Sequence, residues 1–172
     1  MVALVLGAAC GNPASPEISS TSLPADAPDL SLSGVAFARL TEGRVTARGN
    51  AERLDYRRAG ARLEASRGGA VVQPSPPAPF GSVRFVADRI EGEVANRRGV
   101  ASGGVRVDAA RGDSARTERV YYDGDYLRSD TPVAAQGPGY SVQGNGMLAR
   151  TDGTAIQLTR GVQGQLQAEA RR

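Results

Sequence analysis

The sequence contains no histidine, no lysine and no tryptophan, and its only cysteine is Cys10. Histidine is the commonest general base and a frequent zinc ligand, so its absence removes the usual basis for acid–base and zinc chemistry. One cysteine cannot form an intramolecular disulfide bond. Catalysis therefore has little support, and we expect a protein that is not an enzyme, with no catalytic residue, metal or cofactor.

Aromatic residues and long apolar runs are also scarce. Aromatics make up 5% of the chain, so any core must come from Val, Leu, Ile and Ala. The first nine residues form a short apolar run, which would be about 14 Å long as a helix. A bilayer core of about 30 Å needs roughly 20 such residues, so this run is too short to span one. The 22 glycines and ten prolines predict many turns and no long helices.

All 21 basic residues are arginines, and with 18 carboxylates they give a net charge of +3. One interpretation is a phosphate-binding surface, because the guanidinium group binds phosphate through two hydrogen bonds. The preferred one is codon bias in a GC-rich genome. Because the two signs are interspersed, no basic stripe of the nucleic-acid-binding kind appears, and no nucleic-acid partner is expected. A modest anionic partner remains open.

The first ten residues end in Ala8-Ala9-Cys10, which is similar to a bacterial lipobox, where the cysteine is lipidated. Residues 1–10 are therefore interpreted as the remnant of an export signal. Gly7 stands where leucine is usual, and no basic residue precedes the run; a start site further upstream would explain the missing charge and the short run together. The alternative is an N-terminus with a chance cysteine. Residues 11–30 hold four prolines and few large apolar residues, which predicts a flexible tether before a folded body over 31–168.

The body alternates apolar and polar residues with period two, which is typical of half-buried β-strands. Turn sequences separate these runs, including Asp-Gly pairs that favour tight hairpins. The alternating pairs are Val35-x-Phe37, Leu54-x-Tyr56, Val83-x-Phe85, Val105-x-Val107, Val120-x-Tyr122, Tyr140-x-Val142 and Ile156-x-Leu158.

Residues 51–65 contain good helix formers, but Leu54, Tyr56 and Leu63 share no helical face. Internal comparison favours strands, because this segment aligns with residues 87–107 and with two later copies. The aligned apolar anchors are Leu54, Ile90, Val120 and Leu148. The proline-rich insert at 74–79 is expected to be a loop.

Repeated strand–turn–strand units without helices predict one antiparallel structure, either a jelly roll, a sandwich or a barrel. If two sheets close tightly, their alternating apolar residues are simply a core, the usual meaning of this pattern. If the sheets splay apart, the same face becomes a groove that accepts acyl chains. Small, sparse apolar residues and frequent glycine leave the open form possible.

The order of these segments resembles the LptC family of lipopolysaccharide-export proteins and the related LptA/OstA-type domains. Residues 31–166 carry the resemblance, through the motifs Ser102-Gly103-Gly104-Val105, Ser129-Asp130-Thr131-Pro132-Val133 and Gly144-Asn145-Gly146-Met147. The resemblance implies an all-β fold, an open and twisted antiparallel β-jelly roll whose apolar interior carries the acyl chains of lipopolysaccharide. It also implies a periplasmic location.

Two further partners follow from the resemblance: other β-jelly-roll export proteins, joined through edge strands, and an inner-membrane ABC transporter complex.

Members of the family usually begin with a membrane-spanning helix, and a lipid on Cys10 would replace it as the membrane anchor. Without either anchor, a soluble shuttle of the LptA/OstA type is the alternative. The other functional alternative is a structural envelope lipoprotein with a closed sandwich and no lipid cargo.

The residues predicted to face the interior and contact acyl chains are apolar positions on successive strands. They are Phe37, Leu54, Tyr56, Phe85, Ile90, Val105, Val107, Val120, Tyr122, Val142, Leu148, Ile156 and Leu158.

Overall fold

The computed structural model describes residues 27–73, 81–151 and 155–166. Cys10, the export-signal remnant and most of the predicted tether lie outside the described residues, as does the proline-rich insert. Within the described residues, no helix is both long and apolar enough to cross a membrane.

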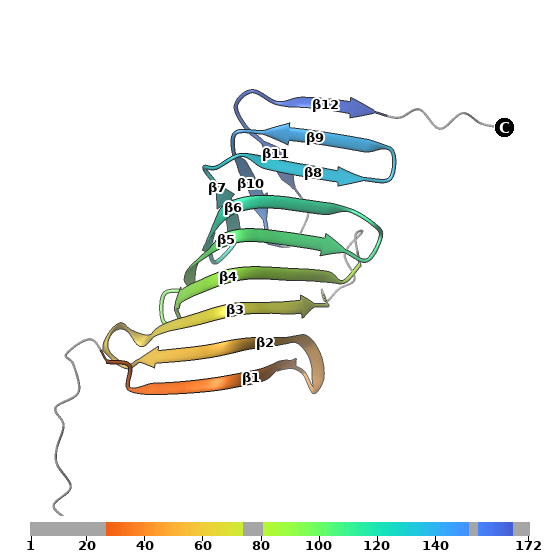
Figure 1. Ribbon diagram of the computed structural model, residues 1–172. Helices are drawn as coiled ribbons and strands as arrows, with labels where there is room; N and C mark the ends of the chain where they lie inside the picture. The colour runs from red at the N-terminus through yellow and green to blue at the C-terminus, as the bar shows by residue number, and fades with distance from the viewer. Residues whose placement is uncertain (1–26, 74–80, 152–154, 167–172) are drawn as a thin grey trace, which may run out of the picture.

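The described chain is an all-β structure with one sheet of twelve antiparallel strands, which does not close on itself (Figure 1). Its only helical element is a single 3₁₀ turn, η1 (Ala59–Ala61). The strands are β1 (Leu30–Thr41), β2 (Arg44–Arg57), β3 (Arg62–Val72), β4 (Val83–Glu93), β5 (Arg98–Ala109), β6 (Ser114–Asp123), β7 (Tyr126–Ser129), β8 (Val133–Gly137), β9 (Tyr140–Gly144), β10 (Met147–Arg150), β11 (Ile156–Leu158) and β12 (Gln163–Leu166).

The segment 51–65, for which helix formers and alternation disagreed, is the end of β2, η1 and the start of β3. Tyr56 pairs with Leu63 across this hairpin, and Gly60 in the turn has a φ of 76°. A left-handed residue in the middle of the segment is incompatible with a continuous α-helix. The strand prediction is therefore confirmed.

The long strands β1–β6 bend near their middles along one line across the sheet. Residues with positive φ mark the line in alternate strands: Gly34 in β1, Arg67 in β3, and Gly103 with Gly104 in β5. At the last pair, β5 holds one residue more than β6 between paired positions, which is a β-bulge. The Gly103–Gly104 pair suits this bend because glycine adopts positive φ without steric cost. The motif Ser102-Gly103-Gly104-Val105 is thus a bend within one strand.

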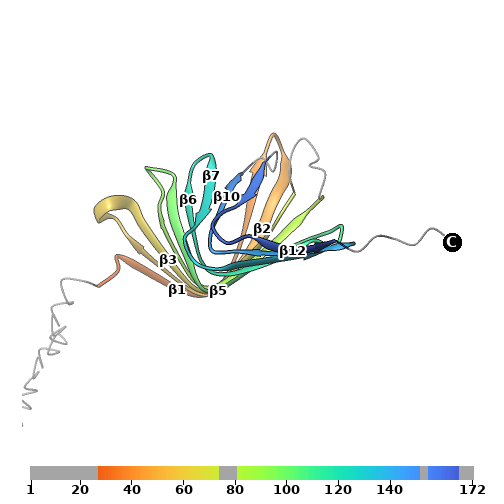
Figure 2. The same ribbon diagram turned by 90° about the horizontal axis from the view of Figure 1, so that it is seen from above.

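The bend divides the sheet into two leaves that diverge from a common vertex (Figure 2). The first leaf contains the halves of β1–β6 on the η1 side of the bend and continues through β7, β10 and β11. The second leaf contains the other halves and continues through β8, β9 and β12. The division becomes complete at β6, where residues 121–123 pair with β7 and residues 114–117 pair with β8.

Beyond β6 the chain crosses the vertex three times, at 130–132, 145–146 and 159–162, moving between the leaves. The crossings are hydrogen-bonded to one another: the amide of Thr159 donates to Gly146 O at 2.9 Å, and the amide of Asn145 donates to Arg160 O at 2.9 Å. The hydroxyls of Thr117 and Ser129 lie 2.9 Å apart beside the first crossing. Two of the family-like motifs, at 129–133 and 144–147, are these crossings.

The fully buried core is small and follows the vertex. Val105 and Val133 are its largest fully buried side chains, with 1% and 2% of their surface exposed. Val105 from the second leaf clusters with Ala101 and Val120 from the first leaf. The two leaves therefore share one core where they meet, and their outer parts are held by strand pairing.

Candidate binding groove

Cross-strand register places apolar side chains in continuous rows on one face of the first leaf, since directly paired residues lie on the same side of a sheet. We call this the inner face. One row crosses nine strands: Leu30, Tyr56, Leu63, Gly92, Gly99, Tyr122, Leu127, Ala149 and Ile156. A second row, nearer the bend, contains Leu32, Leu54, Ala65, Ile90, Ala101 and Val120, then Ser129, Met147 and Leu158.

The second leaf has the same organisation on its own inner face. Its longest row is Phe37, Gly49, Ala70, Phe85, Val107, Ala115, Ala135, Val142 and Gly164. Gly49 allows the ring of Phe37 to lie over it, because a Cβ at Gly49 would collide with that ring. A row nearer the bend contains Val35, Ala51, Gly68 and Ala87, then Val105, Thr117, Val133 and Gly144.

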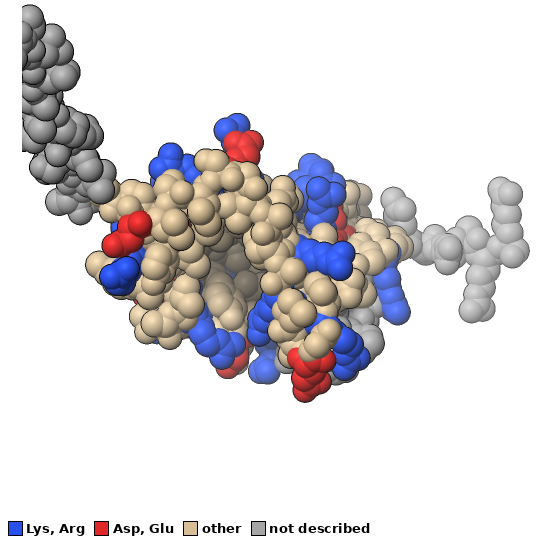
Figure 3. All heavy atoms as spheres, turned by 90° about the horizontal axis from the view of Figure 1, so that it is seen from below, with Lys and Arg blue, Asp and Glu red and all other residues tan. Residues whose placement is uncertain are grey.

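The inner faces of the two leaves face each other across the vertex. At Gly68 on the second leaf, a Cβ atom would lie 3.5 Å from Ile90 Cδ1 on the first leaf. The buried cluster at the vertex likewise combines residues from both leaves. Seen from the β1 side, the molecule is hollowed between the leaves, and uncharged residues surround the hollow (Figure 3). The arrangement is an apolar groove with a buried floor and exposed walls.

Twelve of the thirteen residues predicted to face inward lie on these inner faces. Three of them lie nearest the vertex. Val105 and Val120 belong to the buried cluster, and Ile90 packs against it. The groove walls are less covered: Phe37 is 49% exposed and Ile156 is 65% exposed. The remaining seven are half-buried: Leu54, Tyr56, Phe85, Val107, Tyr122, Val142 and Leu158.

The prediction that Leu148 faces the interior is wrong. Leu148 pairs with Arg128 and Gln157, so it lies on the outer face, 41% exposed. Its neighbour Met147 occupies the inner row that contains Leu54 and Ile90. A shift of one residue moves a side chain to the opposite face of a strand. Aligning the repeat copies on leucine introduced that shift, because the crossing at 145–146 starts β10 with Met147 facing inward.

Several inner-face residues escaped the sequence interpretation, notably Leu63, Leu127, Met147 and Val133. Leu63 has a usable signal, because it alternates with Ala65 in the copy that aligned with the Ile90 segment. Leu127 and Val133 lie in strands of four and five residues, which are too short to display a period. Pairing with a long neighbouring strand is what identifies their faces.

Free strand edges lie at both ends of the groove (Figure 1). At one end, β1 pairs with β2 and with no other strand among the described residues, and Leu30, Leu32 and Phe37 leave apolar surface uncovered there. At the other end, β11 and β12 each pair with one strand, and Ile156 is exposed. An unpaired edge offers main-chain donors and acceptors to another strand. The apolar rows therefore reach positions where a second sheet could extend them.

Tyr140 lies at the rim of the second leaf, on the same face as Val142, and its hydroxyl donates to Asp113 Oδ1 at 2.8 Å. Burial of the phenol and the hydrogen bond to Asp113 both raise its pKa above the ordinary 10.0. Both causes oppose ionisation, because a phenolate would be poorly solvated beside a carboxylate. This bond ties β9 to the β5–β6 turn.

The raised pKa of Tyr140 predicts that the folded protein loses stability at alkaline pH. The raised pKa favours the folded state below pH 10, and this contribution disappears as the pH rises through the pKa of Tyr140. Tyr140→Phe is therefore expected to flatten the decline in the free energy of unfolding above pH 10. Urea unfolding at several pH values checks this, and tyrosinate absorbance shows which phenol ionises last. Parallel declines in the two proteins would contradict the assignment.

No protein-family model matches the chain, and a search of curated proteins finds no match. In the described ranges, no group of three or more Cys, Asp or Glu side chains could hold a metal ion. The functional interpretation therefore depends on the groove itself.

Proposed function

We propose that this protein is a non-catalytic carrier that binds the acyl chains of lipopolysaccharide in its groove and passes the lipid across the envelope. The observation that carries the proposal is the pair of apolar inner faces on leaves that diverge. Apolar area exposed in this way is unfavourable in water, by about 25 cal/mol for each Å². Acyl chains lying along the rows would cover it, whereas no described part of the chain does.

The free edges support the transport part of the proposal. A second β-jelly roll that paired with β1, or with β11 and β12, would continue the inner rows into its own sheet. Lipid could then pass between domains without its chains entering water. We propose such domains, and an inner-membrane ABC transporter complex that supplies the lipid, as the partners, and the periplasm as the location.

The alternative, a structural lipoprotein with a filled sandwich, is less well supported by the geometry. A filled sandwich would cover Phe37 and Ile156, yet these side chains are 49% and 65% exposed. Membrane attachment through a lipid on Cys10 is retained as a proposal; Cys10 lies outside the described residues.

Photo-crosslinking tests whether lipid occupies the groove. A benzophenone amino acid at Val107, on the inner face, is expected to capture lipopolysaccharide in cells, because Val107 pairs with Phe85 in the longest row of the second leaf. The matched control is Tyr121, which lies on the outer face of the first leaf, paired with Val100 and Arg128. Immunoblotting for a lipopolysaccharide adduct provides the readout. Equal adducts at both positions, or none at Val107, would contradict the proposal.

A further inference from the structure

The outer face of the second leaf carries a group of arginines within strands β2, β4, β5 and β6. Arg48 and Arg84 both pair with Val71, on either side of β3, and Arg84 pairs with Asp108. In the adjacent row, Arg106 lies directly opposite Arg116. All four arginines are exposed. We call Arg48, Arg84, Arg106 and Arg116 the arginine face.

The arginine face has too few carboxylates to balance it. Asp108 is the only carboxylate in these two rows, and it accepts a hydrogen bond from Arg106 Nε at 2.9 Å. Arg48, Arg84 and Arg116 form no ion pair or hydrogen bond with any described side chain. Four arginines and one aspartate leave a formal charge of +3 on this part of the sheet.

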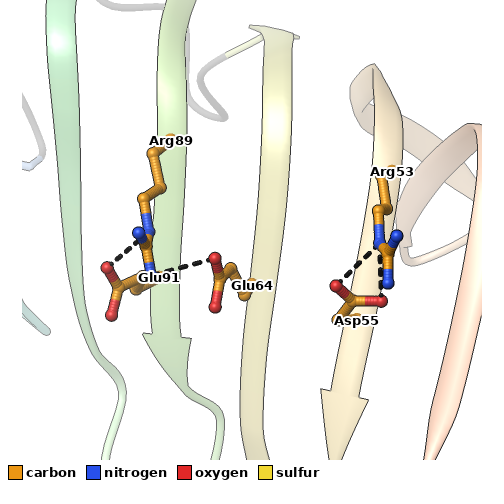
Figure 4. Close-up of polar contacts among 5 residues, drawn as sticks. All are labelled: Arg53, Asp55, Glu64, Arg89 and Glu91. Carbon is orange, nitrogen blue, oxygen red and sulfur yellow. Dashed lines mark hydrogen bonds and ion pairs between the residues drawn. The ribbon is translucent and has the colours of Figure 1, made fainter. Parts of the chain in front are cut away.

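The outer face of the first leaf is richer in ion pairs (Figure 4), although Arg57 lies opposite Arg62 there. Arg53 bonds to Asp55 at 2.9 Å, and Arg89 contacts both Glu64 and Glu91, at 2.9 and 2.8 Å. The two leaves have the same fold and the same alternation, so sheet architecture does not require unpaired arginines. Like charges placed opposite each other, as at Arg106 and Arg116, also destabilise a sheet. An anionic partner would account for their presence.

Several features of the arginine face favour phosphate groups on an extended surface over a protein partner. Guanidinium groups bind phosphate through paired hydrogen bonds. Between Arg48 and Arg84 lies a hollow of about 450 Å³, floored partly by Gly69 and lined also by Arg67 and Asp88, which leaves room for a headgroup. The two rows contain no aromatic residue, whereas cores of protein interfaces are enriched in Tyr, Trp and Phe.

We propose that the arginine face binds the surface of a bilayer that contains anionic phospholipids. The sheet would then lie with its outer face toward the headgroups and its groove turned away from them. Arg48 and Arg84 are two strands apart, about 10 Å, so each can engage a different headgroup. This binding site is separate from the groove, so the proposal stands whatever the groove carries.

Vesicle flotation of the full chain tests the proposal. Vesicles of phosphatidylcholine with phosphatidylglycerol are expected to bind the protein, and vesicles of phosphatidylcholine alone to bind it far less. Each basic residue near such a surface contributes about fivefold to the partition coefficient at low salt. Replacing Arg48 and Arg84 together by glutamine should therefore weaken binding roughly 25-fold.

The matched control replaces Arg58 and Arg97 together by glutamine. This change removes the same charge, but from turns at the tip of the first leaf. Their loss should weaken binding by less than about threefold, through net charge alone. Asp108→Asn should strengthen binding about fivefold, because it removes the one negative charge from these two rows and leaves Arg106 without its carboxylate partner, so the test also includes a gain of affinity. Circular dichroism establishes that each variant is folded.

Three outcomes would overturn the proposal. The first is equal binding to both vesicle compositions, and the second is an equal loss in the two arginine double variants. The third is binding of an acidic polyglutamate peptide, sensitive to Arg48 and Arg84, without vesicle binding; that result would assign the face to an acidic protein partner instead.

Discussion

Replacing Val105 by aspartate is expected to prevent the domain from folding. Val105 is 1% exposed and lies at the vertex, where residues of both leaves pack against it. A carboxylate there would be buried without a partner, which costs more than about 4 kcal/mol. A domain of this size is stable by roughly 5–15 kcal/mol in total. Because few other side chains join the leaves, we expect the loss to be global.

Val71→Asp is the matched control for Val105→Asp, since Val71 is 41% exposed on the outer face of the same leaf. It should cost no more than about 1 kcal/mol, because the lower strand propensity of aspartate is partly offset by attraction to Arg48 and Arg84 on the neighbouring strands. Urea denaturation followed by circular dichroism measures both. A folded Val105→Asp protein with a free energy of unfolding close to that of Val71→Asp would show that the vertex is not the core.

Tyr122→Glu is expected to reduce lipopolysaccharide binding by about 100-fold or more. Tyr122 is half-buried in the longest inner row of the first leaf, paired with Gly99 and Leu127. Bound acyl chains would strip water from a carboxylate at this position, and an unpaired buried charge costs several kcal/mol. A loss of about 1.4 kcal/mol in binding free energy weakens the affinity tenfold, so a loss of about 2.8 kcal/mol is enough for the 100-fold effect.

Its neighbour Tyr121 provides the control, because it has the same side chain and points to the opposite face. Tyr121 pairs with Val100 and Arg128, and the guanidinium of Arg128 lies 5.3 Å from its ring centre. Tyr121→Glu should leave binding within about threefold of the unmodified protein. Phe37→Glu, at a residue 49% exposed on the inner face, tests the same idea where folding is less affected. Equal losses for Tyr121→Glu and Tyr122→Glu would exclude the groove as the binding site.

Much of the fold was predictable from alternation. The pairs Leu54-x-Tyr56 and Val105-x-Val107 alternate strictly, and each lies on one face because successive side chains point to opposite sides of a strand. Residues 51–65 were assigned correctly once the copies were compared. Strands of ten or more residues carry enough positions for this signal, so the long strands were the safest predictions.

The short strands beyond β6 show where prediction from sequence failed. Leu148 was placed inward by alignment, but pairing with Arg128 turns it outward. Leu127 and Val133 were missed because strands of four or five residues show little periodicity. Their faces depend on the three crossings at the vertex, and hydrogen bonds between residues distant in sequence, such as Thr159 to Gly146, position those crossings.

By itself, the sequence determined the long strands and, within each half of such a strand, which side chains share a face, because that property depends only on the two-residue period of an extended chain. Across the bend the alternation shifts by one residue, as from Leu32 to Val35 in β1. Only the tertiary structure decided whether that face is a core or a groove. The same alternation is compatible with a closed sandwich and with an open sheet. The bend at Gly103–Gly104 and the crossings at 145–146 and 159–162 separate the leaves and leave Phe37 and Ile156 exposed. These depend on pairings between distant strands, which local periodicity does not encode.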